Sequence, residues 1–313
     1  MSLLTTQTTY GVGGKKEQFD KLFPQGDRKT PVLDKLPGHE NVEADRVDWD
    51  TETIGAVDLN NAQSEAADYT YAGANVTVKL FNQIQQSTKG WSLSKKASKI
   101  NYAGRKSELQ RQQKIKALEL RRDLEGMILQ TTAAPVVGEN TTPTASAAAG
   151  IPYYIINKGG VNVDNTSATL LEADVREALA GIAANGGGID GNYIMVCTYA
   201  IADTLVDWAS VTDSIVSVDM GTGKFTRRLL TYSSNSGTVT VVPTALIDSA
   251  QVLVLDTQTW GVGFLGNPMD HIWKDKPDGK SGQASASAFR GTFETHWTLV
   301  AKNPTVNARI VIT

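Results

Sequence analysis

The sequence predicts a mixed α+β fold. Three observations carry this prediction: two β-like runs in the first third of the chain, one long helix after them, and a segment in the second half that alternates helix and strand patterns. The chain has 313 residues, of which 41% are hydrophobic and 20% charged. This composition is typical of a folded protein with a sizeable core.

The first segment, residues 1–46, is predicted to be an extended arm with little core of its own. It is polar and is interrupted by Pro24, Pro31 and Pro37 and by several glycines. Its start, MSLLTTQTTYGVGGKKEQF, has no basic region followed by an apolar one, so we expect no signal peptide. No stretch approaches 18 apolar residues, so we expect no transmembrane helix and no membrane partner.

The next segment, residues 47–104, is predicted to contain a long two-stranded β excursion. The runs VDWDTETI and ANVTVKLFNQIQQS alternate apolar and polar positions, and Gly73 and Gly90 are interpreted as breaks. Because an isolated hairpin is marginally stable in water, we expect it to lie on another surface. Trp49 and Trp91 flank it. They could stack on nucleic-acid bases, but we favour anchoring on a neighbouring copy of the chain.

A long helix is predicted over residues 106–131. Its second half carries an apolar stripe at three- and four-residue spacing, formed by Ala117, Leu120, Leu124, Met127 and Ile128. Its first half is polar and basic. The Thr/Ala/Pro-rich stretch TTAAPVVGENTTPTASAAAG, which follows, is predicted to be a surface loop.

Positive charge is concentrated around this helix although the whole chain has a net charge of −3. Residues 79–130 hold 12 Lys and Arg against 4 Asp and Glu, whereas residues 1–78 hold 7 against 13 and residues 131–313 hold 11 against 16. Such asymmetry indicates charge-complementary contact; a solvated helix face is the alternative. The candidate inter-subunit contact residues are Trp49, Lys79, Lys89, Trp91, Lys95, Lys96, Arg111 and Lys114.

Residues 165–265 are predicted to form a compact α/β unit. SATLLEADVREALAGIAANGGG has the pattern of an amphipathic helix with a Ser/Thr cap and a glycine stop, and YAIADTLVDWA that of a second helix. The predicted strands are YIMVCT, RRLLTY, GTVTVVP and AQVLVLD, with SSNSG as a turn, followed in the tail by TFETHWTLVAK and NARIVIT.

The motifs that could carry chemistry are weak, so we predict no catalytic residue, no cofactor and no metal site. GGGIDG matches a dinucleotide-binding glycine pattern but follows a helix and precedes a strand, the reverse of what such a site needs. MGTGKFT lacks the residues of a P-loop, and no GxSxG elbow is present. The remaining candidates are dispersed: His39, His271, His296, Glu172, Asp213 and Asp219. Cys197, the only cysteine, lies in an apolar run and is interpreted as a core residue.

The order of these segments resembles that of a known family. The residues that carry the resemblance are NVTVKLFNQIQQSTKGWSLSKKASKINYAGRKSELQRQQKIKALELRRDLEGMILQ, GIPYYI, VTVVP followed by QVLVLD, and GTFETHWTLVAKN. With them, roughly residues 30–313 resemble the major capsid proteins of tailed bacteriophages with the Hong Kong 97-like fold, and are similar to the SU10-type major head proteins.

The resemblance implies a domain plan. Residues 1–46 would be the N-arm, 47–104 the E-loop and leading peripheral-domain segment, 105–164 the spine helix and peripheral domain, 165–265 the axial domain, and 266–313 the closing peripheral-domain strands. In such proteins the E-loop lies across an adjacent subunit. Lys79, Lys89 and Lys95 fall in the region that is covalently crosslinked in some members, but no motif identifies a partner, so no crosslink is predicted.

The resemblance also implies a structural function. Copies would assemble into hexamers and pentamers of an icosahedral head enclosing double-stranded DNA, bound without sequence preference. The further partners would be a portal and separate scaffolding or decoration proteins. The chain would be made in the host bacterial cytoplasm and located in the virion. The alternatives are an encapsulin-like nanocompartment shell of the same fold, an α/β enzyme, and a nucleic-acid-binding protein, which fits poorly with a pI near 5.7.

Overall fold

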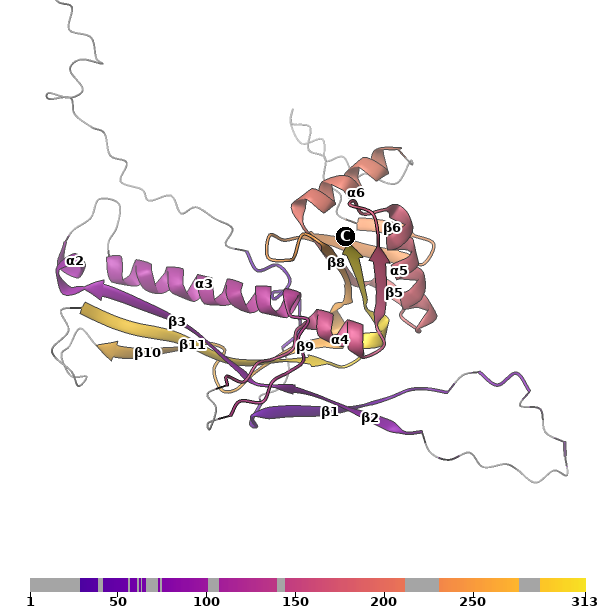
Figure 1. Ribbon diagram of the computed structural model, residues 1–313, viewed down its shortest axis with the longest axis horizontal. Coiled ribbons are helices and arrows are strands. Elements are labelled where there is room, and N and C mark those ends of the chain that lie inside the picture. The colour runs from indigo at the N-terminus through magenta and orange to yellow at the C-terminus, as the bar shows by residue number, and fades with distance from the viewer. Residues whose placement is uncertain are drawn as a thin grey trace, which may run out of the picture. The chain divides into compact units, whose positions relative to one another are not determined.

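The computed structural model is a mixed α+β fold, as the sequence predicts (Figure 1). It describes residues 29–38, 42–55, 57–60, 62, 64–65, 73, 75–100, 107–139, 144–211, 231–275 and 288–313. The elements in chain order are β1 (Arg46–Glu52), β2 (Thr77–Gln83), β3 (Gln85–Ser94), α2 (Lys95–Lys99), α3 (Glu108–Gln130), α4 (Ile151–Asn157), β4 (Val161–Asn165), α5 (Glu172–Ala184), β5 (Ile189–Cys197), α6 (Tyr199–Val211), β6 (Thr231–Ser234), β7 (Gly237–Pro243), β8 (Gln251–Asp256), β9 (Trp260–Phe264), β10 (Asp270–Asp275), β11 (Ala288–Ala301) and β12 (Ala308–Ile312).

Residue contacts divide the described chain into two units. The first contains Lys89–Glu119 and His271–Phe293, and the second contains Lys29–Thr88, Leu120–Asp270 and Glu294–Thr313. The elements β3, α3 and β11 have residues in both units. Among the described residues, no helix is both long enough and apolar enough to cross a membrane.

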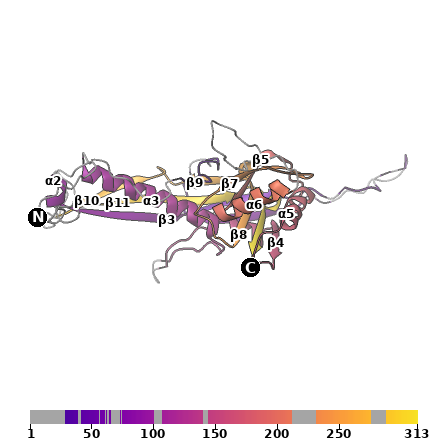
Figure 2. The ribbon, with the colours of Figure 1, turned by 90° about the horizontal axis from the view of Figure 1, so that it is seen from above.

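A six-stranded sheet forms the centre of the second unit. Its strand order is β4-β12-β8-β5-β7-β6, with β5 parallel to β7 and antiparallel to β8. Because successive side chains of a strand point to opposite faces, Met195 and Cys197 of β5 pack with α5 and α6, whereas Ile194 and Val196 pack with α3 and α4. Figures 1 and 2 show α5 and α6 beside this sheet.

The last strand, β12, belongs to the same sheet as β5, β6, β7 and β8. It lies inside this six-stranded sheet, parallel to β4 and antiparallel to β8. The sequence analysis predicts NARIVIT as a strand, which the structure confirms, and its place in the peripheral domain stays a prediction. Ala308 and Ile310 are fully buried there. A run of alternating apolar residues at a chain end predicts a strand, but the pattern does not say which sheet it joins, because that depends on pairing distant in sequence.

The long helix α3 confirms the predicted helix to within two residues at its start and one at its end. The predicted stripe is the buried face: Leu120, Leu124 and Ile128 are each at most 4% exposed. Leu124 and Ile128 join a core that also contains Tyr154, Trp260 and Trp297. The structure adds three strands that the sequence analysis did not predict, β4, β9 and β10. The last two belong to a four-stranded sheet in which β11 pairs β9 and lies between β10 and β3.

Several local predictions are corrected by the structure. Gly90 does not break a strand, because β3 runs through it. The N-cap of α5 is Leu171 rather than Ser or Thr; its backbone N–H donates to the carboxylate of Asp174, which satisfies the free end of the helix. The stretch 131–150 is not entirely a surface loop, since Val136 and Ala147 form a β-bridge. Ala148, Ala149 and Gly150 are buried.

Gly150 explains how that stretch returns to α3. A Cβ atom at this position would lie 2.8 Å from the carbonyl oxygens of Ile128 and Thr131. Only glycine allows the backbone to approach the end of α3 this closely.

The strand and helix patterns YIMVCT, YAIADTLVDWA, GTVTVVP and AQVLVLD are confirmed as β5, α6, β7 and β8. Of RRLLTY, only Thr231 and Tyr232 lie within the described residues.

Candidate functional site

The β1–β2 hairpin is the first candidate surface, and the structure confirms that its two strands pair. They are antiparallel, from Arg46 opposite Gln83 to Glu52 opposite Thr77 (Figure 1). Trp49 lies on β1 and donates its indole Nε1–H to the carbonyl oxygen of Ala301 at 2.7 Å. Its ring centroid is 5.8 Å from that of Tyr154. The ring and its polar N–H therefore have partners within the same chain, and because Trp49 is only half-buried, its contact with a neighbouring copy stays a prediction.

Asn82, on β2, also connects the hairpin to the core, at the end of the hairpin that we call its base. The sequence analysis missed this residue. Its side chain is fully buried. The amide Nδ2 donates to the carbonyl oxygens of Leu299 (2.8 Å) and Ala149 (3.2 Å), while Oδ1 accepts from the N–H groups of Ala149 (2.9 Å) and Gln83 (3.0 Å). The period of two along β2 placed Asn82 on the same face as Leu80, and this was the signal that could have identified it.

The far end of the hairpin carries apolar side chains that nothing in the described chain covers. Ile54 is 90% exposed, Val57 86%, Leu59 91% and Val76 84%. Single exposed apolar residues are ordinary, but several within the connection from β1 to β2 make it a candidate interaction surface. The sequence analysis recognised the alternation at Val76 and did not recognise the aliphatic residues that follow β1.

Trp91, the second predicted anchor, is buried within the first unit. It is 5% exposed, and its Nε1–H donates to Nε2 of His271 at 3.1 Å. Its ring makes an edge contact with Trp273 at 5.1 Å. A Cβ atom at position 291 would lie 2.8 Å from the same ring, so Gly291 makes room for it. Little of its surface remains for a neighbour, so the ring stabilises the first unit, and the predicted subunit contact of Trp91 stays a prediction.

The predicted lysines are at the surface, with one exception. Lys79 is exposed on β2, opposite Asp50. Lys95 and Lys96 are exposed on α2, which begins where the hydroxyl of Ser94 accepts the N–H of Ala97 at 3.0 Å. Lys89 is half-buried in β3 and has an interaction within the chain.

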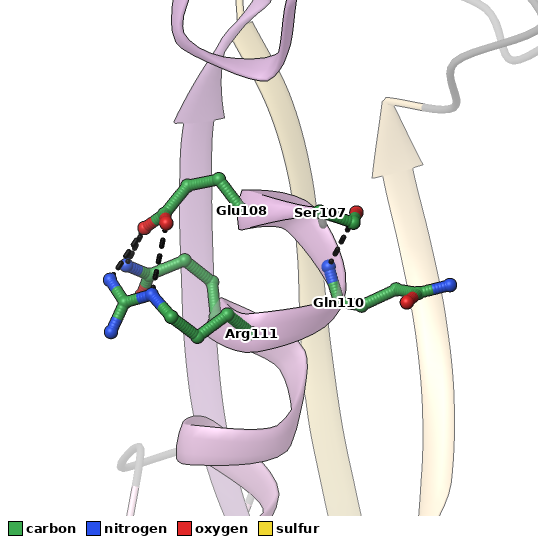
Figure 3. A network of polar contacts seen from close by, with 5 residues as sticks. Ser107, Glu108, Gln110 and Arg111 are labelled. Atoms are coloured by element: carbon green, nitrogen blue, oxygen red, sulfur yellow. Dashed lines mark hydrogen bonds and ion pairs between the residues drawn. The ribbon is translucent and has the colours of Figure 1, made fainter. Parts of the chain in front are cut away.

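The start of α3 brings charged residues together within one turn (Figure 3). The carboxylate of Glu108 accepts from Arg111 Nη2 at 2.5 Å, Arg111 Nε at 2.9 Å and Gln112 Nε2 at 2.9 Å. The hydrogen bond from Arg111 to Glu108 raises the pKa of the guanidinium further. Arg111 is therefore paired within its own helix, whereas Lys114, one turn later, is exposed.

The candidates for chemistry stay dispersed in the structure. Cys197 is fully buried, and burial raises the pKa of its thiol to about 12, which suits a core residue. His271 packs against aromatic rings, and burial lowers its pKa. His296 contacts the carboxylate of Glu294 at 2.6 Å. Glu172 pairs with Arg176 at 2.6 Å.

Within the described ranges no group of three or more His, Cys, Asp or Glu side chains could hold a metal ion. GGGIDG joins the end of α5 to β5, as predicted. His39, Asp213, Asp219 and the segment MGTGKFT lie outside the described residues.

Comparison with known proteins agrees with the arrangement of elements. A family model described as SU10 major capsid protein matches residues 4–313. Among solved structures, the cyanophage A-1(L) capsid asymmetric unit is similar with a TM-score of 0.68 and 11% identity, covering 99% of each chain. A chain from Gordonia phage Cozz is similar with a TM-score of 0.62 and 12% identity, covering 100% of this chain and 95% of that one.

One solved structure of another kind shares the fold. The holo-SrpI encapsulin complex from Synechococcus elongatus PCC 7942 has a TM-score of 0.55 and 9% identity, covering 100% of this chain and 96% of that chain. Comparison with curated proteins gave no significant sequence match. At identities this low, structural likeness establishes the Hong Kong 97-like fold, and the family match distinguishes between the functions that this fold serves.

Proposed function

The chain belongs to the SU10 major capsid protein family, and from this premise we propose that its copies assemble into the hexamers and pentamers of an icosahedral phage head. The head would enclose double-stranded DNA, contacted without sequence preference, and would include a portal and separate scaffolding or decoration proteins. The chain would be made in the cytoplasm of the host bacterium. Because the family is structural, we propose no catalytic activity and no cofactor.

The observation that carries the proposal is the exposed apolar end of the β1–β2 hairpin. Ile54, Val57 and Leu59 are not covered by the described part of their own chain, which leaves them at least 86% exposed. Burying an aliphatic side chain of this size contributes about 1.5–3 kcal/mol. Three such residues, repeated at each contact of a closed shell, supply a large association free energy. We propose that the hairpin end packs on a second copy.

The basic residues support the same proposal in a revised form. With Trp49 and Trp91 engaged inside the chain, the charged candidates that stay exposed are Lys79, Lys95, Lys96 and Lys114. Since the rest of each copy is acidic, identical chains offer these lysines partners of opposite sign. Packaged DNA is the second partner that would suit them, through counterion release.

The test is assembly of a variant that changes only the hairpin end. Ile54→Ser with Leu59→Ser should leave the chain folded and reduce shells and capsomers, as seen by light scattering and negative-stain microscopy. A matched control is Ile272→Ser, an exposed apolar residue on β10, which should assemble normally. Normal shells from the hairpin variant, or wild-type chain that stays monomeric at every concentration and salt, would overturn the proposal.

The encapsulin-like alternative differs in contents rather than in subunit fold. Shells purified from cells that also make the packaging components should contain DNA if the chain forms a phage head. Shells filled with a cargo protein and lacking DNA would favour the nanocompartment. The family match favours the phage head.

A further inference from the structure

A single buried carboxyl group joins three distant stretches of the second unit. Glu125 lies on α3 and is 1% exposed. One of its oxygens accepts the backbone N–H of Leu33 at 3.0 Å, and the other accepts the hydroxyl of Thr244 at 3.4 Å. The nearby backbone N–H of Val32 also favours the charged form of the carboxyl and so lowers its pKa. The carboxyl therefore connects α3 to a turn near the start of the described chain and to the segment between β7 and β8.

The turn at residues 30–36 explains why an acceptor is needed there. Its backbone bonds run from the N–H of Asp34 to the carbonyl of Thr30 and from the N–H of Leu36 to the carbonyl of Val32, as in one turn of a helix. The first N–H groups of such a turn have no partner within it. Glu125 supplies that partner from another element, while Val32 and Leu36 pack into the same core as Leu124 and Ile128.

No cation neutralises this carboxyl among the described residues. The turn contributes Lys35 and Asp34, and Asp34 forms an ion pair with Arg121 of α3. The helix also carries Arg122, and the segment after Thr244 carries Asp248; neither forms an ion pair with Glu125. Burial therefore outweighs the hydrogen bonds and the effect of the Val32 N–H, and together with the nearby charge of Asp34 it raises the pKa of Glu125 to about 7.

We propose that Glu125 is a pH-responsive latch between the turn at residues 30–36 and α3. The latch is closed, with the turn packed on the helix, when the carboxyl is protonated, and the turn separates from the helix more easily when the carboxyl ionises. In the protonated form one oxygen still accepts the N–H of Leu33. Its O–H can donate to Thr244 Oγ1, where one lone pair already accepts the N–H of Leu246 at 3.2 Å. In the ionised form a buried charge faces only neutral donors, and water entry between the turn and α3 relieves it.

The direction of the pH dependence follows from linkage. In the closed form the carboxyl has a pKa near 7, whereas after opening it is solvated and returns toward the ordinary value of 4.5. The closed form thus binds more protons between these values, so opening becomes easier as pH rises from about 4.5 to 7 and levels off above that. The equilibrium constant for opening is therefore on the order of a hundredfold larger at high pH than at low pH.

This latch is a property of the folded chain and does not require the proposed assembly. Its test is hydrogen exchange of the amides of Val32 and Leu33 between pH 5 and 8.5, corrected for the intrinsic exchange rate. In the wild type we expect protection to fall on the order of a hundredfold across this range. Glu125→Gln keeps an acceptor oxygen but cannot ionise, so its protection should be independent of pH.

The matched control is Glu119→Gln, a substitution on the same helix at a partly exposed carboxylate paired with Lys116 at 2.6 Å. It should keep the wild-type pH dependence. Protection that is flat with pH in the wild type, or that titrates equally in Glu125→Gln, would overturn the latch. If Glu125→Gln does not fold, the wild-type carboxyl can be titrated by carbon NMR, where a midpoint near 7 supports the proposal and one near 4.5 refutes it.

Discussion

The two ends of the β1–β2 hairpin both carry apolar side chains but differ in how these are covered. At the base, Leu80 is 4% exposed and Asn82 is fully buried. At the far end, Ile54 and Leu59 are at least 90% exposed. The strands pair without interruption from Arg46 to Glu52, so the same ladder begins on the core and ends without cover. Apolar residues in one supersecondary unit therefore stabilise the fold at one end and, in our proposal, stabilise association at the other.

The difference indicates that the base of the hairpin stabilises the fold and that its far end is available for contact with a partner. A two-stranded hairpin alone is marginally stable, so its base needs the hydrogen bonds of Asn82 and Trp49 to hold a fixed direction. Once the base is fixed, the end is presented to a partner with less ordering to be done on binding. Substitutions at the base should therefore change folding, and substitutions at the end should change assembly.

The largest expected effect is on folding, from Asn82→Ala. The change leaves the N–H and carbonyl of Ala149 and the carbonyl of Leu299 without their partner in a buried site. At about 1–3 kcal/mol for each buried group, we expect the free energy of unfolding to fall by about 3–5 kcal/mol, measured by chemical denaturation.

The control for this prediction is Asn60→Ala at the far end of the hairpin. Asn60 is exposed, so its replacement should change stability by less than about 0.5 kcal/mol. Equal effects from the two substitutions would show that the base and the end do not differ as the structure indicates.

Local pattern predicted the elements of this protein better than their partners. The stripe through Leu120, Leu124 and Ile128 placed α3 correctly, because helix periodicity is written within a few turns. Alternation also identified β12, but its position between β4 and β8 depends on residues some 50 to 150 positions away. Nothing in NARIVIT alone encodes that choice of sheet.

The candidate contact residues show the same division. An aromatic ring in a segment with little local core was predicted to need a neighbouring copy, and for Trp91 the missing core comes from β10 and Gly291, about 200 residues later. Glu125 was passed over because a lone glutamate in a helix is ordinarily solvated. Its burial depends on the 30–36 turn and on Thr244, neither of which is near it in sequence.

A smaller effect is expected from Trp49→Phe. The phenyl ring can keep the contact with Tyr154, but the hydrogen bond from Nε1 to the carbonyl oxygen of Ala301 is lost. We expect the free energy of unfolding to fall by about 0.5–1.5 kcal/mol, with assembly of the folded chain unchanged. Unaltered stability together with a loss of shells would instead return Trp49 to the subunit contact that the sequence analysis assigned to it.

The smallest effect on folding is expected from Lys79→Glu, which sharpens the comparison along the strand itself. Lys79 is exposed opposite Asp50, and reversal places two like charges across the ladder. Because exposed ion pairs contribute only about 0–1 kcal/mol and are screened by salt, the free energy of unfolding should change by about 0.5 kcal/mol or less.

The control for Lys79→Glu is Lys79→Gln, since it removes the charge without adding repulsion. If Lys79 faces an acidic surface on a second copy, Lys79→Glu should reduce the yield of empty shells more than Lys79→Gln does. Added salt should reduce this difference in yield between the two variants. Equal yields from both variants, with a defect only in DNA retention, would assign this lysine to the genome instead.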